Sequence, residues 1–264
     1  MDNWTLTGQQ VEQFAADGYL MLEDYFPRGD IDLLLKVARA DQKLAAGAAD
    51  RHDSEGRVSR LSLRSNLPDD LYSAFVRNPR VVGPMEQLLG EEVYHYHHKM
   101  MLKEPFTGGA WEWHQDYGYW YKQFLFADMA SCMIAVDRAT KENGCLQVLK
   151  GSHRLGRLEH GITGDQTGAD MERIRAVEDK FERVYCEMAP GTALFFHSNL
   201  LHRSDANDSP MARWSLICCY TAASNTPFVE GTSGTFAPLE RWDDDKLRAV
   251  GAQHRAAVLA ADGG

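Results

Sequence analysis

The chain has 264 residues, of which 44% are hydrophobic and 25% are charged, a composition typical of an ordinary globular protein. Its 28 basic and 38 acidic side chains give a formal net charge of −10, which argues against a general nucleic-acid-binding protein but leaves room for a locally basic pocket. No stretch of the sequence approaches the roughly 18 consecutive apolar residues of a membrane-spanning helix, so we expect no membrane association.

The first 91 residues are predicted to be mostly helical and to pack on the rest of a single domain that spans residues 1–264. Thr7 and Gln10 can form a capping box at the start of a helix that runs to Asp17. Gly18 can end that helix, and the apolar run YLML (19–22) predicts a short strand. Further helices are predicted at Ile31–Ala45, at roughly 69–77 and at roughly 79–89, with a polar loop at 46–58.

From residue 92 onward the pattern changes to short apolar or alternating runs separated by turn residues. An insertion at 156–182, with one predicted helix, interrupts this pattern, and the tail at 239–264 is predicted to be helical from Leu239 to Ala261. The regular spacing of strands and turns favours an antiparallel barrel or sandwich, jelly rolls included, with α-helices packed around a mainly β core. The predicted strands are 92–103, 111–117, 130–137, 145–149, 183–188, 192–197 and 213–221.

The cysteines indicate a reducing compartment. There are five, two of them are adjacent, and most lie in apolar runs such as SLICCY (215–220). Buried free thiols fit this pattern better than a disulfide framework does. Because the N-terminus also lacks a basic start followed by an apolar segment, we expect the protein to be cytoplasmic.

Two distant segments can supply the ligands of a metal ion. His114 and Asp116 lie two residues apart in a predicted strand, so both side chains should leave the same face. The apolar strand of GTALFFHSNLLHRSD (191–205) delivers His197 and His202. Two histidines and one carboxylate form the facial triad suited to Fe(II). His202 is preferred over His197 because an arginine follows it at a suitable spacing.

That arginine is Arg213, which opens the apolar strand RWSLICCY (213–220) and shares a strand face with Ser215. Its planar guanidinium can pair with a carboxylate through two hydrogen bonds. A metal triad combined with an inward arginine suits a 2-oxo acid that chelates the metal at one end and is held at the other.

The sequence resembles the phytanoyl-CoA dioxygenase-like family of Fe(II)/2-oxoglutarate oxygenases. The resemblance rests on WHQD (113–116), NGCLQVLKGSH (143–153), APGTALFFHSNLLHRS (189–204) and RWSL (213–216), with LTGQQVEQFAADGYLML (6–22) as the family's opening helix and strand. It implies a double-stranded β-helix, the cupin-like form of the jelly roll, with iron held by His114, Asp116 and His202. It also implies 2-oxoglutarate bound to Arg213, O₂ as oxidant, and hydroxylation with release of succinate and CO₂. Related halogenases lack the acidic ligand that Asp116 provides here.

Several other residues are candidates for binding co-substrate or substrate. In VYHYHHKMMLKEP (93–105), Lys99 lies on a basic strand face that could bind an anion or simply face solvent at a sheet edge. Arg60, Arg64 and Asn66 could hold a phosphonate, phosphate or carboxylate, or could belong to a solvated helix start. Tyr119 and Trp120 follow the metal motif and could line a pocket, and Gln147 is a polar candidate. His153, in the turn GSH (151–153), is expected to hold a loop in place rather than to bind metal.

The favoured substrate is a small anionic or zwitterionic molecule. Similarity around EWHQDYGYW (112–120) extends to aminoalkylphosphonate hydroxylases and ectoine hydroxylases of the family, although YGYWYKQFLFADM (117–129) does not match the longer acidic segment of the latter. An acyl-CoA or another lipid-like substrate is the alternative. A non-catalytic ligand-binding β-helix protein and a metal-dependent isomerase or hydrolase are alternatives from other classes. The sequence is compatible with a monomer or a homodimer.

Overall fold

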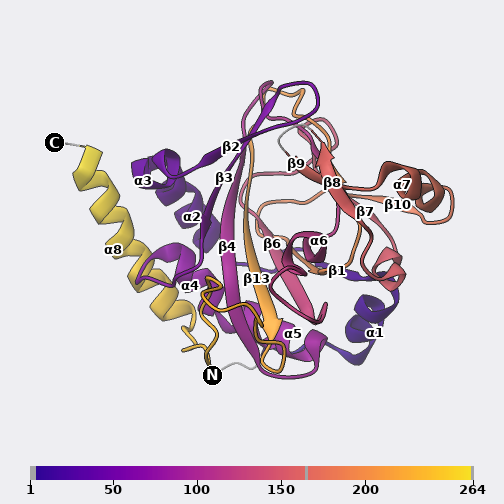
Figure 1. Ribbon diagram of the computed structural model, residues 1–264. Helices are drawn as coiled ribbons and strands as arrows, with labels where there is room; N and C mark the ends of the chain where they lie inside the picture. Colours follow the sequence, from indigo (N-terminus) through magenta and orange to yellow (C-terminus); the bar gives the residue numbers. More distant parts are fainter. Residues whose placement is uncertain (1–3, 164–165, 263–264) are drawn as a thin grey trace.

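The structure is a computed structural model that describes residues 4–163 and 166–262. On one side of the molecule the C-terminal helix packs beside helices of the N-terminal part, and other helices lie on the opposite side (Figure 1). The helices are α1 (Gly8–Asp17), α2 (Arg28–Ala40), α3 (Gln42–Ala46), α4 (Leu71–Arg77), α5 (Pro79–Leu89), α6 (Asp116–Trp120), α7 (Met171–Glu178) and α8 (Asp244–Asp262), with a 3₁₀ turn at Ser152–Leu155.

The strands form two antiparallel sheets and a separate hairpin. The seven-stranded sheet runs in the order β1 (Tyr19–Leu22), β11 (Ala193–His197), β6 (Met129–Ala135), β13 (Arg213–Ala222), β4 (Val93–Lys103), β3 (Val58–Arg64) and β2 (Ala49–His52). The four-stranded sheet runs in the order β10 (Arg183–Cys186), β7 (Leu146–Leu149), β12 (His202–Ser204) and β5 (Trp111–His114). The hairpin joins β8 (His160–Thr163) to β9 (Gln166–Ala169). This architecture confirms the expected mainly β fold with surrounding helices.

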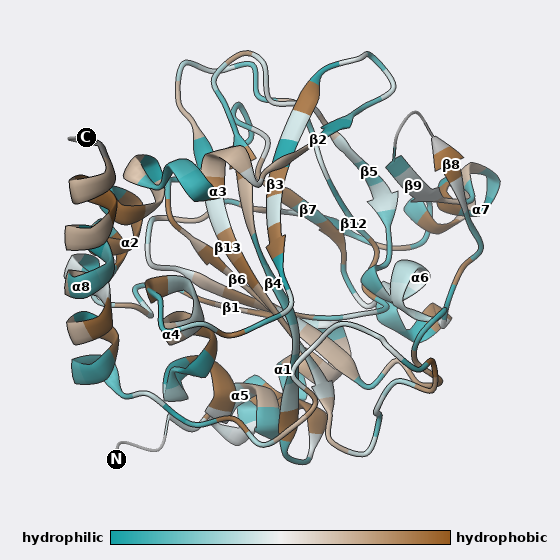
Figure 2. Ribbon diagram, turned by 60° about the vertical axis from the view of Figure 1, so that its left-hand side comes forward, coloured by the Kyte–Doolittle hydropathy of each residue, from teal (hydrophilic) through white to brown (hydrophobic). Residues whose placement is uncertain are grey.

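Side-chain alternation along the central strands separates two hydrophobic cores. In β13, Trp214, Leu216 and Cys218 pack toward the helices, whereas Ile217 and Cys219 pack toward the smaller sheet. Figure 2 shows hydrophobic residues gathered along β13, β6 and β1. Because Arg213 and Ser215 share the register of Ile217, the same alternation turns them into the space between the sheets.

The N-terminal predictions hold at α1 and need revision at α2. Thr7 and Gln10 form the predicted capping box, and Gly18 ends α1 with a left-handed φ of 80°. The predicted helix at 31–45 is instead two helices, because Asp41 leaves the helical conformation and caps α3. Its carboxylate accepts hydrogen bonds from the backbone of Lys43 and Leu44 and from the hydroxyl of Tyr72, all at 3.0 Å.

The segment 46–58, predicted to be a loop, contains β2, which pairs with β3 to extend the larger sheet beyond β4. Arg60 and Arg64 therefore lie on a strand rather than at a helix start. The polar composition that favoured a loop is that of a sheet edge, where charged side chains discourage pairing with other chains.

Three further points differ from the sequence-based expectation. The strand predicted at 111–117 ends at His114, and α6 begins two residues later. The insertion at 156–182 contains the β8–β9 hairpin as well as the predicted helix. The run 202–204, for which no strand was predicted, forms β12 by pairing with β5 and β7 on either side. Each correction comes from a tertiary partner that the local pattern does not reveal.

Within the described ranges, no helix combines the length and the apolar character needed to span a membrane.

Buried histidines make the stability of this fold depend on pH. Burial lowers the pKa of His197 to about 4, while its Nδ1 accepts a hydrogen bond from the backbone N–H of Asn199 at 3.0 Å. Burial also lowers the pKa values of His95 and His98. Between the unfolded value near 6.5 and these lower values, the unfolded chain binds protons that the folded protein does not.

We therefore expect the free energy of unfolding to fall as the pH drops from about 6.5 toward 4, with each such histidine contributing at most about 1.4 kcal/mol per pH unit. Denaturant titrations at several pH values would measure this slope. His197→Asn keeps an acceptor for the N–H of Asn199 but has no titrating ring. The free energy of unfolding of this variant should therefore depend less on pH, by at most about 1.4 kcal/mol per pH unit. An unchanged slope in this variant would contradict the assignment.

Candidate metal centre

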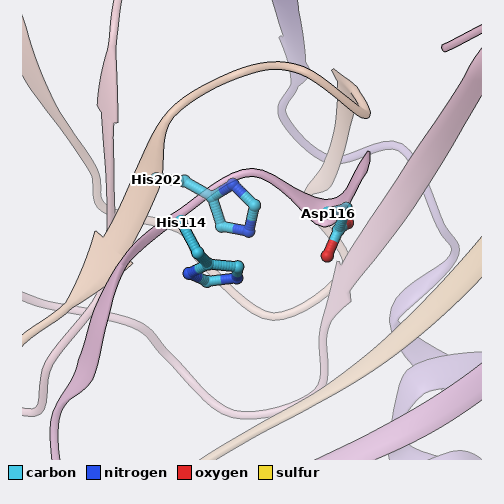
Figure 3. A group of neighbouring side chains, drawn as sticks. All are labelled: His114, Asp116 and His202. Atoms are coloured by element: carbon cyan, nitrogen blue, oxygen red, sulfur yellow. The ribbon is translucent and has the colours of Figure 1, made fainter. Parts of the chain in front are cut away.

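Three buried side chains converge where strand β5 of the smaller sheet ends. His114 ends β5, Asp116 begins α6 and His202 begins β12, and one ligand atom from each lies within 4.8 Å of the others. The antiparallel pairing of β12 with β5 sets His202 directly opposite His114, with ring centroids 4.0 Å apart. Figure 3 shows the two rings and the carboxylate pointing toward one another. Their exposures are only 5%, 2% and 4% for His114, Asp116 and His202.

Hydrogen bonds to the main chain fix the tautomer of both imidazoles. Nδ1 of His114 donates to the carbonyl of Glu112 at 2.7 Å, and Nδ1 of His202 donates to that of Leu200 at 2.9 Å. Nε2 of each ring is then the free acceptor. Burial lowers the pKa of both histidines, and the nearby His202 ring lowers the pKa of His114 further because two adjacent imidazoles resist protonation, so both rings are neutral at neutral pH. Neutral imidazole held by an outer hydrogen bond is the form that binds metal ions.

The carboxylate of Asp116 is held from two sides. Ser131 Oγ in β6 donates to Oδ2 at 3.1 Å, and Nζ of Lys99 in β4 lies 3.9 Å from Oδ1. Asp116 reaches the histidines from the first turn of a helix, not from the strand position that was expected. Two neutral imidazoles and one oriented carboxylate fit the donor set of a facial-triad Fe(II) site.

We call His114, Asp116 and His202 the metal-binding cluster. This cluster and Arg213 line one narrow cavity of about 40 Å³ between the two sheets. Arg213 is only 3% exposed. Its Nε has no hydrogen-bond partner among the described residues, and its Nη1 reaches Ser215 Oγ only at 3.5 Å. Burial lowers the pKa of the guanidinium to about 10. A buried, under-paired cation is costly unless an anion joins it, so this end of the cavity suits a carboxylate.

A second, wider cleft of about 620 Å³ opens beside the first and shares Lys99, Trp111 and Asp116 with it. Aromatic side chains form one part of its wall. Charged groups lie on two segments that are distant in sequence, Arg51 in β2 and Glu230 in the loop before α8. The cleft lining includes Tyr96, His97, Tyr119, Trp120, Gln123 and Val229. The predicted residues Lys99, Tyr119 and Trp120 are therefore brought together around the metal-binding cluster.

A β-bulge changes which side chains of β4 face this cleft. The pairing with β13 shifts register between Cys219 and Tyr220, which leaves Tyr96 as the extra residue. Tyr96 and His97 consequently both line the cleft, while His95 and His98 turn away and contact each other at 3.1 Å. Strict alternation along β4 would place His95 and His97 on one face, and the bulge breaks that alternation.

Four residues proposed for substrate binding lie elsewhere. The guanidinium of Arg60 binds Asp50 and the carbonyl of Ala45, and that of Arg64 binds Asp70 at 2.6 Å. Asn66 is exposed, and Gln147 donates to Asp205 at 2.5 Å. None of the four lines the two cavities described above.

The histidines that compete with His202 have other partners. Besides its bond to Asn199, His197 packs near Phe14 and His153. His153 donates through Nε2 to the carbonyl of Ala15 in α1 at 3.2 Å. Both histidines therefore link the β core to the first helix.

Sequence reasoning missed Ser131, Trp111 and the loop at 229–233. Ser131 had a readable signal, because it is the single hydroxyl in the apolar strand MASCMIA (129–135). Trp111 also had a readable signal, because it lies three residues before His114 in the same predicted strand. The loop at 229–233 has no sequence pattern that points to a binding site, and it reaches the cleft through the tertiary fold.

Comparison with known proteins agrees with this geometry. The chain is 33% identical to L-proline trans-4-hydroxylase of Streptomyces griseoviridis over 178 residues, covering 60% of this chain and 66% of that enzyme. It is 25% identical to ectoine dioxygenase of Stutzerimonas stutzeri, covering 87% and 82%. The apo crystal structure of EctD from S. alaskensis superposes with a TM-score of 0.74 at 25% identity, covering 92% and 89%.

Crystal structures of the same EctD have been solved with bound Fe and with 2-oxoglutarate and 5-hydroxyectoine, and they match this chain with TM-scores of 0.76 and 0.74. At 23% identity, these TM-scores show a shared double-stranded β-helix fold. Residues 14–215 match the phytanoyl-CoA dioxygenase (PhyH) family. The protein thus belongs to the phytanoyl-CoA dioxygenase family of Fe(II)- and 2-oxoglutarate-dependent oxygenases.

Proposed function

We propose that the protein hydroxylates an unactivated C–H bond of a small zwitterionic or anionic molecule, consuming O₂ and 2-oxoglutarate and releasing succinate and CO₂. The observation that carries the proposal is the cavity with the metal-binding cluster at one end and the under-paired guanidinium of Arg213 at the other. A 2-oxo acid with a second carboxylate has matching groups at both of its ends.

In this proposal Fe(II) is held by Nε2 of His114, Nε2 of His202 and the carboxylate of Asp116. When bound there, the iron supplies the O₂ activation and C–H oxidation that amino-acid side chains cannot perform. The guanidinium of Arg213 donates hydrogen bonds to the distal carboxylate of 2-oxoglutarate, and Ser215 provides a hydroxyl beside it. The apolar residues around them, Met133, Phe196 and Ile217 among others, exclude water from the reacting groups.

Lys99 lies where the two cavities meet, and its ammonium is close to Asp116. It can orient the metal-binding carboxylate, and it can also attract an anionic group of co-substrate or substrate. Tyr96, Trp111 and Trp120 present aromatic surface in the wider cleft, which suits an ammonium or a ring. Arg51 and Glu230 add one charge of each sign.

This lining supports a small substrate that carries both charges. L-proline and ectoine, named in two relatives, are small molecules of this kind, and aminoalkylphosphonates share the same combination of charges. A coenzyme A thioester fits less well, because its phosphates call for a cluster of basic side chains. Among the described residues that line the cleft, Lys99, Arg51 and the buried His97 are the basic ones.

His202→Ala should abolish 2-oxoglutarate turnover, because it removes one of three metal ligands. His197→Ala is the matched control, since His197 lies on the preceding strand and bonds to Asn199 instead. Succinate release with Fe(II), 2-oxoglutarate and O₂ would be measured for both variants. Loss of turnover in the His197 variant with retention in the His202 variant would reverse the ligand assignment.

Small zwitterions should stimulate succinate release above the substrate-free rate. A panel of L-proline, ectoine, 2-aminoethylphosphonate and a long-chain acyl-CoA would test this, with each product identified by a mass gain of one oxygen. Stimulation by the acyl-CoA alone would contradict the proposed substrate class while leaving the reaction type intact.

A further inference from the structure

The insertion at 156–182 holds the backbone of the metal motif at the residue between two of its ligands. That residue, Gln115, is fully buried. Its side-chain amide donates to the carbonyls of Gly156 and Asn199 at 2.7 and 2.8 Å, and its Oε1 accepts from the N–H of Leu158 at 2.7 Å. Two of these three bonds go to the start of the insertion.

His160, the first residue of β8, adds a bond to the main chain itself. Its Nε2 accepts a hydrogen bond from the backbone N–H of Gln115 at 3.0 Å. Its Nδ1 lies 2.9 Å from the carbonyl of Leu158 and donates to it. The two contacts together define a single tautomer, with the proton on Nδ1 and the lone pair of Nε2 directed at the N–H of the peptide that links His114 to Gln115.

The neighbouring helix is shaped around the same ring. A Cβ on Gly118 would lie 2.2 Å from ring atoms of His160, so only glycine fits at this position. Further along α6, the hydroxyl of Tyr119 donates to the carbonyl of Thr167 in β9 at 2.5 Å. The β8–β9 hairpin therefore contacts α6 at two points beyond Gln115.

The position of this bond matters because the chain changes direction there. β5 ends at His114, Gln115 is extended, and Asp116 already belongs to α6. The direction of the Gln115 peptide sets how the carboxylate of Asp116 lies relative to the ring of His114. In the described part of the structure, no sheet hydrogen bond holds this N–H, and His160 takes that place.

We propose that His160 is a positioning residue for the metal site, acting through the Gln115 peptide to hold His114 and Asp116 in a metal-binding arrangement. The inference rests on the proposed function, since it presumes that these residues bind Fe(II). Partners of metal ligands that lie one shell further out typically contribute about 10- to 100-fold to metal affinity. We expect His160 to contribute an effect in this range through its two hydrogen bonds, which go to main-chain atoms of Gln115 and Leu158.

The dissociation constant for Fe(II), measured by anaerobic equilibrium dialysis on the full chain, tests this. His160→Ala should weaken Fe(II) binding by about tenfold or more. His160→Gln places an acceptor near the former Nε2 and should recover most of the affinity. His153→Ala is the matched control, a histidine that bonds to a backbone carbonyl in α1, away from the metal motif, and it should bind Fe(II) as the wild type does.

Gly118→Ala gives an independent test that does not remove the ring. Alone it should displace His160 and weaken Fe(II) binding. In the His160→Ala background the added methyl group has room, so it should cause no further loss. A fully additive loss in the double variant would contradict the proposed path through His160.

Melting temperatures of all variants separate positioning from folding. A lower melting temperature for His160→Ala with an unchanged dissociation constant for Fe(II) would overturn the inference. Absence of Fe(II) binding in the wild type would instead overturn the proposed function, so the two failures are distinguishable.

Discussion

The site depends on the pairing of two short strands, β5 and β12. Their register places His202 opposite His114, although the two residues are far apart in sequence, and each histidine then uses a local carbonyl to fix its tautomer. β12 is itself held on its other side by β7, so His202 lies on an inner strand and His114 lies on the neighbouring edge strand. A shift of one residue in this pairing would turn His202 to the opposite face and remove the metal site.

The second constraint is the burial of charge. Arg213 lies opposite Lys103 across β13 and β4, and burial lowers the pKa of both side chains. Lys103 is bonded to Ser204 and to the carbonyl of Asp205, whereas Arg213 lacks comparable partners. Two adjacent buried cations are unfavourable for folding alone. In the proposed function, the under-paired guanidinium faces the cavity because it binds a dianionic co-substrate there.

Features that depend on the local residue pattern could be predicted from the sequence. Features that depend on a tertiary contact could not. The capping box at Thr7 and the inward face of Arg213 and Ser215 follow from spacing alone. The bulge at Tyr96 does not, because it depends on how β4 pairs with β13. The strand at 49–52 forms only because β3 offers an edge. Asp116 was assigned to the metal site for a reason that proved wrong, since it reaches the site from a helix, and His160 had no local signal.

The central claim is that a single cavity binds iron at one end and a carboxylate at Arg213 at the other. The most direct measurement is the visible absorption of the anaerobic protein with Fe(II), titrated with 2-oxoglutarate. We expect a weak saturable band in the wild type, with half-saturation shifted at least about tenfold higher in Arg213→Ala, as loss of a charge-assisted hydrogen-bonded pair requires. No band in the wild type, or identical half-saturation in the variant, would contradict the account.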